Sequence, residues 1–216
     1  MRSTGKKLPS VGAVVVALVV LSACSGSGQG DGKDRGVAPI GWSTCNALFG
    51  AERVDELQEA MGQGTLRTLN TSTSLDDLTS SWVTLAESWE PGRDRHFASG
   101  PCTLGTDGTG KQFRSDVSWS YGSLAALKAQ GIWETAGKDV YVLRRDSGLH
   151  ITAVFPCKIK GSHQAQEAQL PLEVETQVTN IPGFDTGFLG ELTVRLARTV
   201  AKKLPCTNDP KIPDAL

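Results

Sequence analysis

The amino-acid sequence predicts an α+β domain: an antiparallel sheet of about four strands with helices packed on one face. Two observations lead to this prediction. Segments whose apolar residues recur with the spacing of a helix come first, segments of alternating polarity follow, and a helical segment ends the chain. The connections between the strand segments are of hairpin length, which favours antiparallel pairing over a doubly wound parallel sheet.

Two helical regions are predicted before the strands. In residues 44–61, apolar side chains fall at roughly helical spacing, and this stretch is expected to divide at Gly50. In residues 75–89, Leu and Trp recur every three or four residues, with Ser74 placed as the N-cap and Pro91 as the stop. We interpret the stripe of Trp and Leu as a side that faces the core; the alternative is a groove that binds a partner.

Four strands are predicted in the second half of the chain, at 113–121, 140–145, 149–156 and 170–178. The first and last of these alternate polar and apolar residues. The middle two flank Asp-Ser-Gly at 146–148, which is expected to form the turn of a hairpin. A short helix is predicted at 123–130. A final helix is predicted to have on its inner side Leu189, Leu192, Leu196 and Val200.

The N-terminus has the three-part layout of a secretory signal. Three basic residues precede an 11-residue apolar run at 11–21, and small residues follow it. The run is too short for a permanent membrane span, which needs about 20 apolar residues. Residues 1–23 are therefore predicted to be a signal peptide. The alternative, a buried helix of the fold, is disfavoured because a Gly-rich stretch follows the run.

The residues that end the signal, Leu-Ser-Ala-Cys at 21–24, resemble the lipobox of bacterial lipoproteins. The resemblance implies that the Cys24 thiol carries a diacylglycerol and that cleavage occurs before it. Two or three acyl chains anchor a protein stably, whereas a single chain is marginal. We therefore expect a lipidated Cys24 and a flexible Gly/Ser-rich tether at 24–39, followed by a single domain at 40–216. The expected location is the extracytoplasmic face of the cell membrane.

Four further cysteines remain after Cys24, namely Cys45, Cys102, Cys157 and Cys206. An even number in an exported chain predicts two disulfides, because the compartment outside the cytoplasm is oxidising. A structural zinc site is the alternative, but such sites usually have ligands in close pairs, and these cysteines are widely spaced. We expect no metal and no cofactor. Four cysteines allow three pairings, and the residues alone do not choose among them.

Short sequences around the cysteines carry a wider resemblance. After the lipobox and the tether come TCNALFG at 44–50, GPCTLG at 100–105, VFPCKIKG at 154–161 and LARTVAKKLPC at 196–206. Together these resemble uncharacterised cell-envelope lipoproteins of actinobacteria, especially those of streptomycetes. The resemblance implies an envelope location and the disulfide pairs Cys45–Cys102 and Cys157–Cys206. It supplies no catalytic motif for any position of this chain.

Residues 105–111 (Gly-Thr-Asp-Gly-Thr-Gly-Lys) nearly match a phosphate-binding loop, in which backbone amides and a Lys hold nucleotide phosphates. Gln112 stands where that motif needs the hydroxyl of Ser or Thr to bind magnesium. A predicted strand follows in place of the helix whose N-terminus would face the phosphates. We therefore predict a polar loop here.

The three histidines, His96, His150 and His163, form no recognisable catalytic pattern. The sequence contains neither a His pair at i, i+4 for a metal nor a Gly-x-Ser-x-Gly elbow for a serine nucleophile. A Ser–His–Asp triad assembled from distant residues is an alternative, with His96 as its best candidate base. His150 lies on a predicted strand, on the side opposite to Leu149 and Ile151.

The last helix has a basic outer side formed by Arg195, Arg198 and Lys202, opposite its leucines. We interpret these cations as complements to the helix dipole near its C-terminus and as a solvated surface. The alternative is a site for an anion or a partner.

The chain has 22 Lys and Arg residues against 23 Asp and Glu, and 21% of its residues are charged. This balance argues against a disordered chain and against a strongly basic nucleic-acid binder. The leading hypothesis is a membrane-anchored extracytoplasmic lipoprotein that acts as a non-enzymatic binding or accessory domain of the cell envelope. The expected partners are the membrane, through Cys24, and an envelope protein or small ligand. The alternatives are an envelope hydrolase with an unrecognised active site and a purely structural wall-associated module.

Overall fold

A computed structural model describes residues 40–216, with the exception of 63, 70–71 and 94–97. The predicted signal peptide, Cys24 and the tether lie outside the described residues, as does His96. The described helices are α1 (Ile40–Phe49), α2 (Ala51–Met61), α3 (Leu75–Glu87), α4 (Leu124–Gln130), α5 (Gln166–Gln169) and α6 (Thr186–Lys203). The strands are β1 (Leu66–Thr68), β2 (Ser99–Thr106), β3 (Gln112–Trp119), β4 (Glu134–Gly137), β5 (Val140–Arg145), β6 (His150–Phe155) and β7 (Leu172–Thr179).

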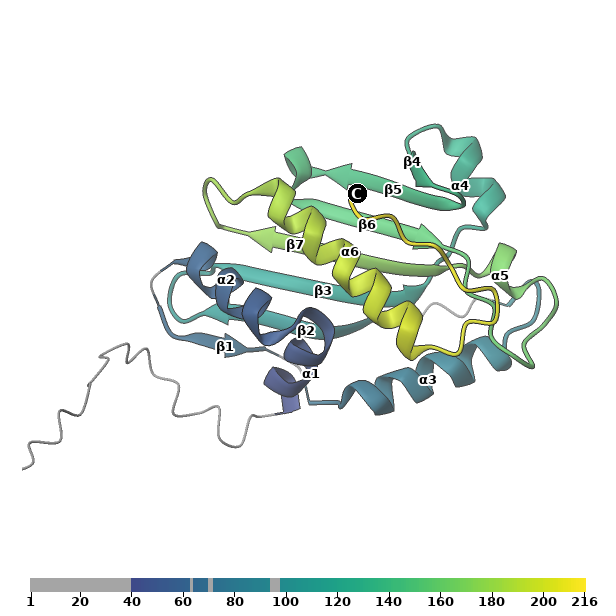
Figure 1. Ribbon diagram of the computed structural model, residues 1–216, viewed down its shortest axis with the longest axis horizontal. Coiled ribbons are helices and arrows are strands. Elements are labelled where there is room, and N and C mark those ends of the chain that lie inside the picture. The colour runs from purple at the N-terminus through teal and green to yellow at the C-terminus, as the bar shows by residue number, and fades with distance from the viewer. Residues whose placement is uncertain (1–39, 63, 70–71, 94–97) are drawn as a thin grey trace, which may run out of the picture. The chain divides into compact units, whose positions relative to one another are not determined.

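The seven strands belong to one antiparallel sheet, in the order β1-β2-β3-β7-β6-β5-β4 (Figure 1). The prediction of helices with a single antiparallel sheet is confirmed, but the predicted number of about four strands is wrong. The predicted strands are β3, β5, β6 and β7, and the structure adds β1, β2 and β4. Of the added strands, β1 and β4 are short edge strands. The other, β2, contains Gly100, Pro101 and Gly105, which are residue types that are depleted in strands.

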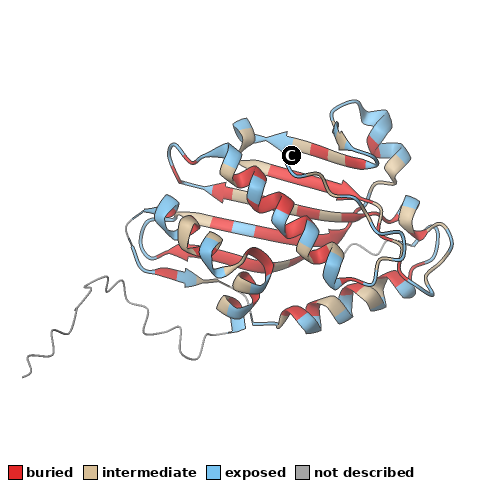
Figure 2. Cartoon of the chain, viewed as in Figure 1, coloured by how far each residue is buried: buried red, intermediate tan, exposed pale blue. Residues whose placement is uncertain are grey.

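Helices α1, α2, α3 and α6 cover one face of the sheet (Figure 1). Along the central strands, the side chains that face these helices alternate with those of the other face and are buried, as Phe113 and Val117 of β3 are beside Val178 and Val174 of β7. Figure 2 shows buried residues along the strands and at intervals along α1 and α6. The core therefore lies between the sheet and these helices.

The helical predictions are confirmed in their main features. Gly50 separates α1 from α2, and its φ of 83° lies in the left-handed region that glycine adopts easily. Ser74 caps α3, and its hydroxyl accepts a hydrogen bond from the backbone N–H of Asp77 at 3.2 Å. The indole of Trp82 is fully buried and donates to Ser99 Oγ at 3.0 Å. The Trp and Leu stripe of α3 therefore faces the core and is not a groove.

Two disulfides connect helices to the sheet. Cys45 of α1 bonds to Cys102 of β2, and Cys157, which follows β6, bonds to Cys206, which follows α6. The Cα atoms are 5.0 Å apart in each pair, within the range that a disulfide spans. This is the pairing that the resemblance implied. Each bond holds one end of the helical layer against the strands.

Candidate functional site

Polar side chains from four neighbouring strands form ordered rows on the face of the sheet opposite the helices. The first row, across β3, β7, β6 and β5, contains Arg114, Gln177, His150 and Arg145. The second row, across β3, β7 and β6, contains Asp116, Glu175 and Thr152. Because side chains alternate between the two faces of a sheet, these residues point away from the core. We call these seven residues the outer-face network.

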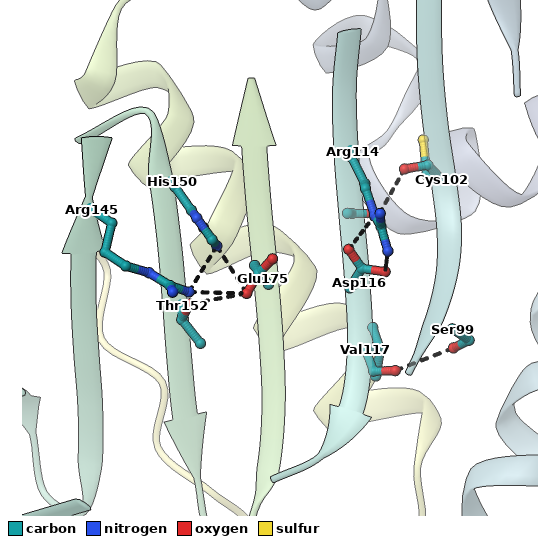
Figure 3. Close-up of polar contacts among 10 residues, drawn as sticks. Ser99, Cys102, Arg114, Asp116, Val117, Arg145, His150, Thr152 and Glu175 are labelled. Atoms are coloured by element: carbon teal, nitrogen blue, oxygen red, sulfur yellow. Dashed lines mark hydrogen bonds and ion pairs between the residues drawn. The ribbon is translucent and has the colours of Figure 1, made fainter. Parts of the chain in front are cut away.

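Glu175 lies at the centre of the outer-face network (Figure 3). Its Oε2 is 2.9 Å from Nε2 of His150 and 3.6 Å from Nη2 of Arg145. The hydroxyl of Thr152 donates a hydrogen bond to the same oxygen at 3.3 Å. The side chains of His150 and Glu175 are only 12% and 24% exposed. The contact between His150 and Glu175 is therefore largely shielded from solvent, whereas the side chain of Arg145 is half exposed.

The surroundings of Glu175 lower the pKa of its carboxyl group. Burial alone would raise this pKa, because burial disfavours the charged form. The hydrogen bond from His150, the electrostatic interactions with His150 and Arg145, and the hydrogen bond from Thr152 act in the opposite direction and outweigh burial. The outer face therefore presents a carboxylate that stays ionised into more acidic solution than an ordinary Glu.

Arg114 and Asp116 form the second charged pair of the network. Nε and Nη2 of Arg114 donate to the two carboxylate oxygens of Asp116 at 2.6 and 2.8 Å (Figure 3). This bidentate hydrogen bond is the main reason why the pKa of Arg114 is raised. Asp116 is directly opposite Glu175 in the register, where two uncompensated like charges would destabilise the strand pair. Each carboxylate instead has its own basic partner.

A shallow hollow lies over β3 and β7 within the network. It has a volume of about 180 Å³ and is lined by Ala98, Arg114, Asp116, Ser118, Glu173 and Glu175. Pockets that enclose a drug-sized ligand are typically about 300–1,000 Å³. This hollow is therefore suited to receiving one polar group of a partner and not to enclosing a whole ligand.

The outer-face network does not form a nucleophilic triad. Its hydroxyl belongs to Thr152 and donates to the carboxylate of Glu175, whereas a nucleophile would hydrogen-bond to the imidazole of His150. Over the described ranges of the chain, no group of three or more His, Cys, Asp or Glu side chains is arranged to hold a metal. The chemistry that the network offers is a fixed pattern of hydrogen-bond donors, acceptors and charges.

The structure separates the predicted histidines. His150 joins the network from the side of the strand that the sequence predicts. His163 packs edge-on against the ring of Trp89, with centroids 5.9 Å apart, and its Nδ1 accepts a hydrogen bond from the backbone N–H of Ala165. His96 lies outside the described residues, so a triad based on it stays a prediction.

The stretch that resembles a phosphate-binding loop, residues 105–111, contains the last two residues of β2 and the connection to β3. As predicted, a strand and not a helix follows it. The Nζ of Lys111 donates to the backbone carbonyl of Met61 at 2.8 Å, which ties this connection to the end of α2. The Lys that would hold a phosphate therefore has a structural contact instead.

The amino-acid sequence alone does not identify Glu175, Arg145 or Asp116 as members of a site. The alternation of the segment LEVETQV placed Glu175 on the polar side of its strand, which was a partial signal. Its partners lie on β5 and β6, and they meet it only because of the register in which the strands pair.

None of the described helices combines the length and the hydrophobicity that crossing a membrane requires. Comparison of the chain with protein-family models, with curated proteins and with solved structures finds no match. The function must therefore be inferred from the chain's own residues.

Proposed function

We propose that the protein is an extracytoplasmic lipoprotein, held on the membrane by lipid on Cys24, whose domain binds a polar envelope component through the outer-face network. The domain acts without catalysing a reaction. The observation that carries this proposal is the asymmetry of the sheet. One face is covered by helices that two disulfides secure, and the other presents ordered side chains whose charges are compensated.

A surface of this kind is suited to recognition of a polar partner. Its side chains are already held by their neighbours, so binding orders few additional rotamers and costs less conformational entropy. Its alternating basic and acidic groups discriminate between partners, because a partner with the wrong charge pattern meets like charges. The hollow over β3 and β7 supplies a place where one polar group of the partner can be received.

The proposed location draws on the N-terminal sequence. The signal layout, the lipobox-like residues before Cys24 and the resemblance to actinobacterial envelope lipoproteins all point to the outer side of the cell membrane. Two disulfides are consistent with an oxidising compartment. A Gly/Ser-rich tether of this length has a root-mean-square reach of about 20 Å, which lets the domain turn its outer face toward a neighbouring component.

Replacement of Cys24 with Ala tests the anchor. We expect the Cys24→Ala protein to leave the membrane fraction or to keep its signal peptide, because the acyl chains supply the membrane affinity. Cell fractionation and mass spectrometry of the mature N-terminus measure this, and Ser25→Ala, which keeps the thiol, is the matched control. A Cys24→Ala protein that stays in the membrane fraction with its signal cleaved would contradict the lipid anchor.

A photo-crosslinking amino acid tests the binding surface. Placed at Gln177 in the outer-face network, it should yield crosslinked adducts with an envelope component in living cells. The matched control is the same amino acid at Glu87, an exposed position on α3. We expect adducts from position 177 and not from position 87. Adducts from neither position would contradict the proposal and favour the structural-module alternative.

A further inference from the structure

A second hollow lies on the helical side of the molecule, between α6, α2 and the C-terminal segment. It has a volume of about 550 Å³. Three arginines line it, Arg53 from α2 and Arg195 and Arg198 from α6, and the other polar residues of the lining are Glu191, Thr199 and Asp214. Guanidinium groups from two helices therefore converge on one hollow.

Two of the three guanidinium groups are held by carboxylates. Nη1 of Arg53 lies 2.5 Å from the carboxylate of Glu56, and Nη2 lies 3.0 Å from that of Glu191. Nη2 of Arg198 lies 2.5 Å from the carboxylate of Asp214 and donates to the backbone carbonyl of Ile212 at 3.0 Å. These ion pairs hold both guanidinium groups in place beside the hollow before any ligand binds. Binding would therefore cost less conformational entropy.

Arg195 differs from its two neighbours. Its guanidinium lies against the backbone at Gly50, where an added Cβ would come within 2.7 Å of Nη2. The glycine that divides α1 from α2 thus also makes room for this side chain. Within the part of the chain that the structure describes, Arg195 forms no ion pair. It is also three residues from Arg198 on the same helix, a spacing at which like charges repel.

We propose that this hollow binds a phosphate group, either as free phosphate or as the phosphodiester of a lipid headgroup. The carboxylates near the hollow are already taken up by two of the arginines: Arg53 contacts Glu56 and Glu191, and Arg198 contacts Asp214. A phosphate has more acceptor oxygens than a carboxylate and matches the planar fork of arginine, so it accepts from several guanidinium groups at once. It would supply Arg195 with the countercharge that the described chain does not, and would relieve the repulsion between the arginines.

This inference is independent of the outer-face network, which lies on the other face of the sheet. The sequence left open a site for an anion on the basic outer side of the last helix, and this inference takes up that alternative. Of the basic residues on that side, Arg195 and Arg198 line the hollow. Lys202 does not line the hollow, and we still interpret it as a cation that complements the helix dipole.

Titration of the full chain with inorganic phosphate tests the site, with the side-chain Nε–Hε resonances of arginine followed by NMR at low ionic strength. We expect saturable shifts in the wild type and at least about a tenfold weaker affinity in Arg195→Ala, because charge-assisted hydrogen bonds are lost. Arg195→Lys should recover only part of the affinity, since a point charge replaces the fork. Arg67→Ala, which removes an exposed arginine on β1, should bind as the wild type does.

A second titration identifies the source of the phosphate. Short-chain phosphatidylglycerol, which carries a phosphodiester, is compared with free phosphate on the same variants. Tighter Arg195-dependent binding of the lipid assigns the site to a headgroup, and tighter binding of free phosphate assigns it to the soluble ion. Two results would overturn the proposal: absence of saturable shifts with both probes, or equal affinities in the wild type and Arg195→Ala.

Discussion

Glu175 of β7 accepts hydrogen bonds from His150 and Thr152 of β6 and lies near the guanidinium of Arg145 on β5. These contacts outweigh burial and lower the pKa of its carboxyl group. In acid the unfolded chain therefore binds a proton at Glu175 more readily than the folded chain does. The resulting stabilisation is fully present above the ordinary pKa of Glu, and it is lost as the pH falls through the lowered value.

Replacement of Glu175 with Gln should lower the free energy of unfolding by about 1–2 kcal/mol at neutral pH, because hydrogen bonds to a charged group are lost. The difference from the wild type should shrink as the pH falls below 4.5, the ordinary value for this group, because the wild-type carboxylate then loses its own charge. Urea unfolding at a series of pH values measures both effects.

The matched control for this variant is Glu87→Gln, at an exposed position on α3. It should leave the stability and its pH dependence close to those of the wild type. If the difference between the wild type and Glu175→Gln stayed constant down to the acid-unfolding region, the carboxylate would not be stabilised by its neighbours as argued.

Among the elements, α3 is specified almost entirely by its own residues. Ser74 caps the first turn, Asp76 and Asp77 lie near the positive end of the helix dipole, and Leu85 continues the apolar repeat of the helix. The side that faces the core consists of Leu75, Leu78, Trp82 and Ala86. Local signals and tertiary packing agree here, which explains why the sequence predicts this helix closely.

Replacement of Ser74 with Ala should destabilise the protein by about 1 kcal/mol, because the N–H of Asp77 loses its hydrogen-bond acceptor. Urea unfolding should show a lower midpoint with an unchanged slope, since the surface exposed on unfolding is the same. Ser81→Ala is the control. The hydroxyl of Ser81 bonds to the backbone carbonyl of Asp77 within the helix, and Ala is the better helix former there. Equal losses from the two substitutions would argue against a capping role.

Strand β2 is the opposite case. Its sequence, SGPCTLGT, contains two glycines and a proline, and on local preference it is a loop. It nevertheless pairs with β1 on one side and with β3 on the other, with an irregularity in register between Ser99 and Cys102. Its pairing with β3 and the disulfide to α1 outweigh the local preference of the segment. Tertiary contacts therefore decide this element.

Across the whole molecule, the two disulfides connect elements that are distant in the sequence. They join residues 57 and 49 positions apart, and each connects the helical layer to a strand or to the residues that follow one. On the chain-entropy model, closing loops of this length restricts the unfolded chain and stabilises the fold by about 4 kcal/mol for each bond. Because the loops are of similar length, the two bonds should contribute nearly equally.

Two double variants test these contributions. Cys45→Ala with Cys102→Ala, and Cys157→Ala with Cys206→Ala, should each lower the free energy of unfolding by about 2–5 kcal/mol, measured by urea unfolding under non-reducing conditions. Peptide mapping of the wild type without reductant is the accompanying measurement. A peptide that links Cys102 to Cys157 would contradict the pairing, and an unchanged stability in either double variant would contradict the role of that bond.

Much of the fold is readable from the amino-acid sequence, and the readable part has a common cause. Helices α3 and α6, strands β3 and β7 and the hairpin of β5 and β6 each have a regular pattern of apolar residues or a turn sequence of their own. Such patterns are local, because a helix or strand presents its residues to one side with a fixed period. The disulfide pairs were implied by resemblance and not by the residues, and the structure has the same pairs.

The number of strands, their order and the outer-face network were decided only by the tertiary structure. A strand's own residues determine which of its sides is polar, as the parity of His150 and Glu175 shows. Which polar groups meet is determined by the strands beside it and by their register, and the burial of the opposite face sets that register. Glu175 lies between Asp116 and Thr152 because Val174 and Thr176, its neighbours along β7, are buried against the helices. The burial of that face depends on packing across the whole core, so no local sequence pattern can predict which residues meet Glu175.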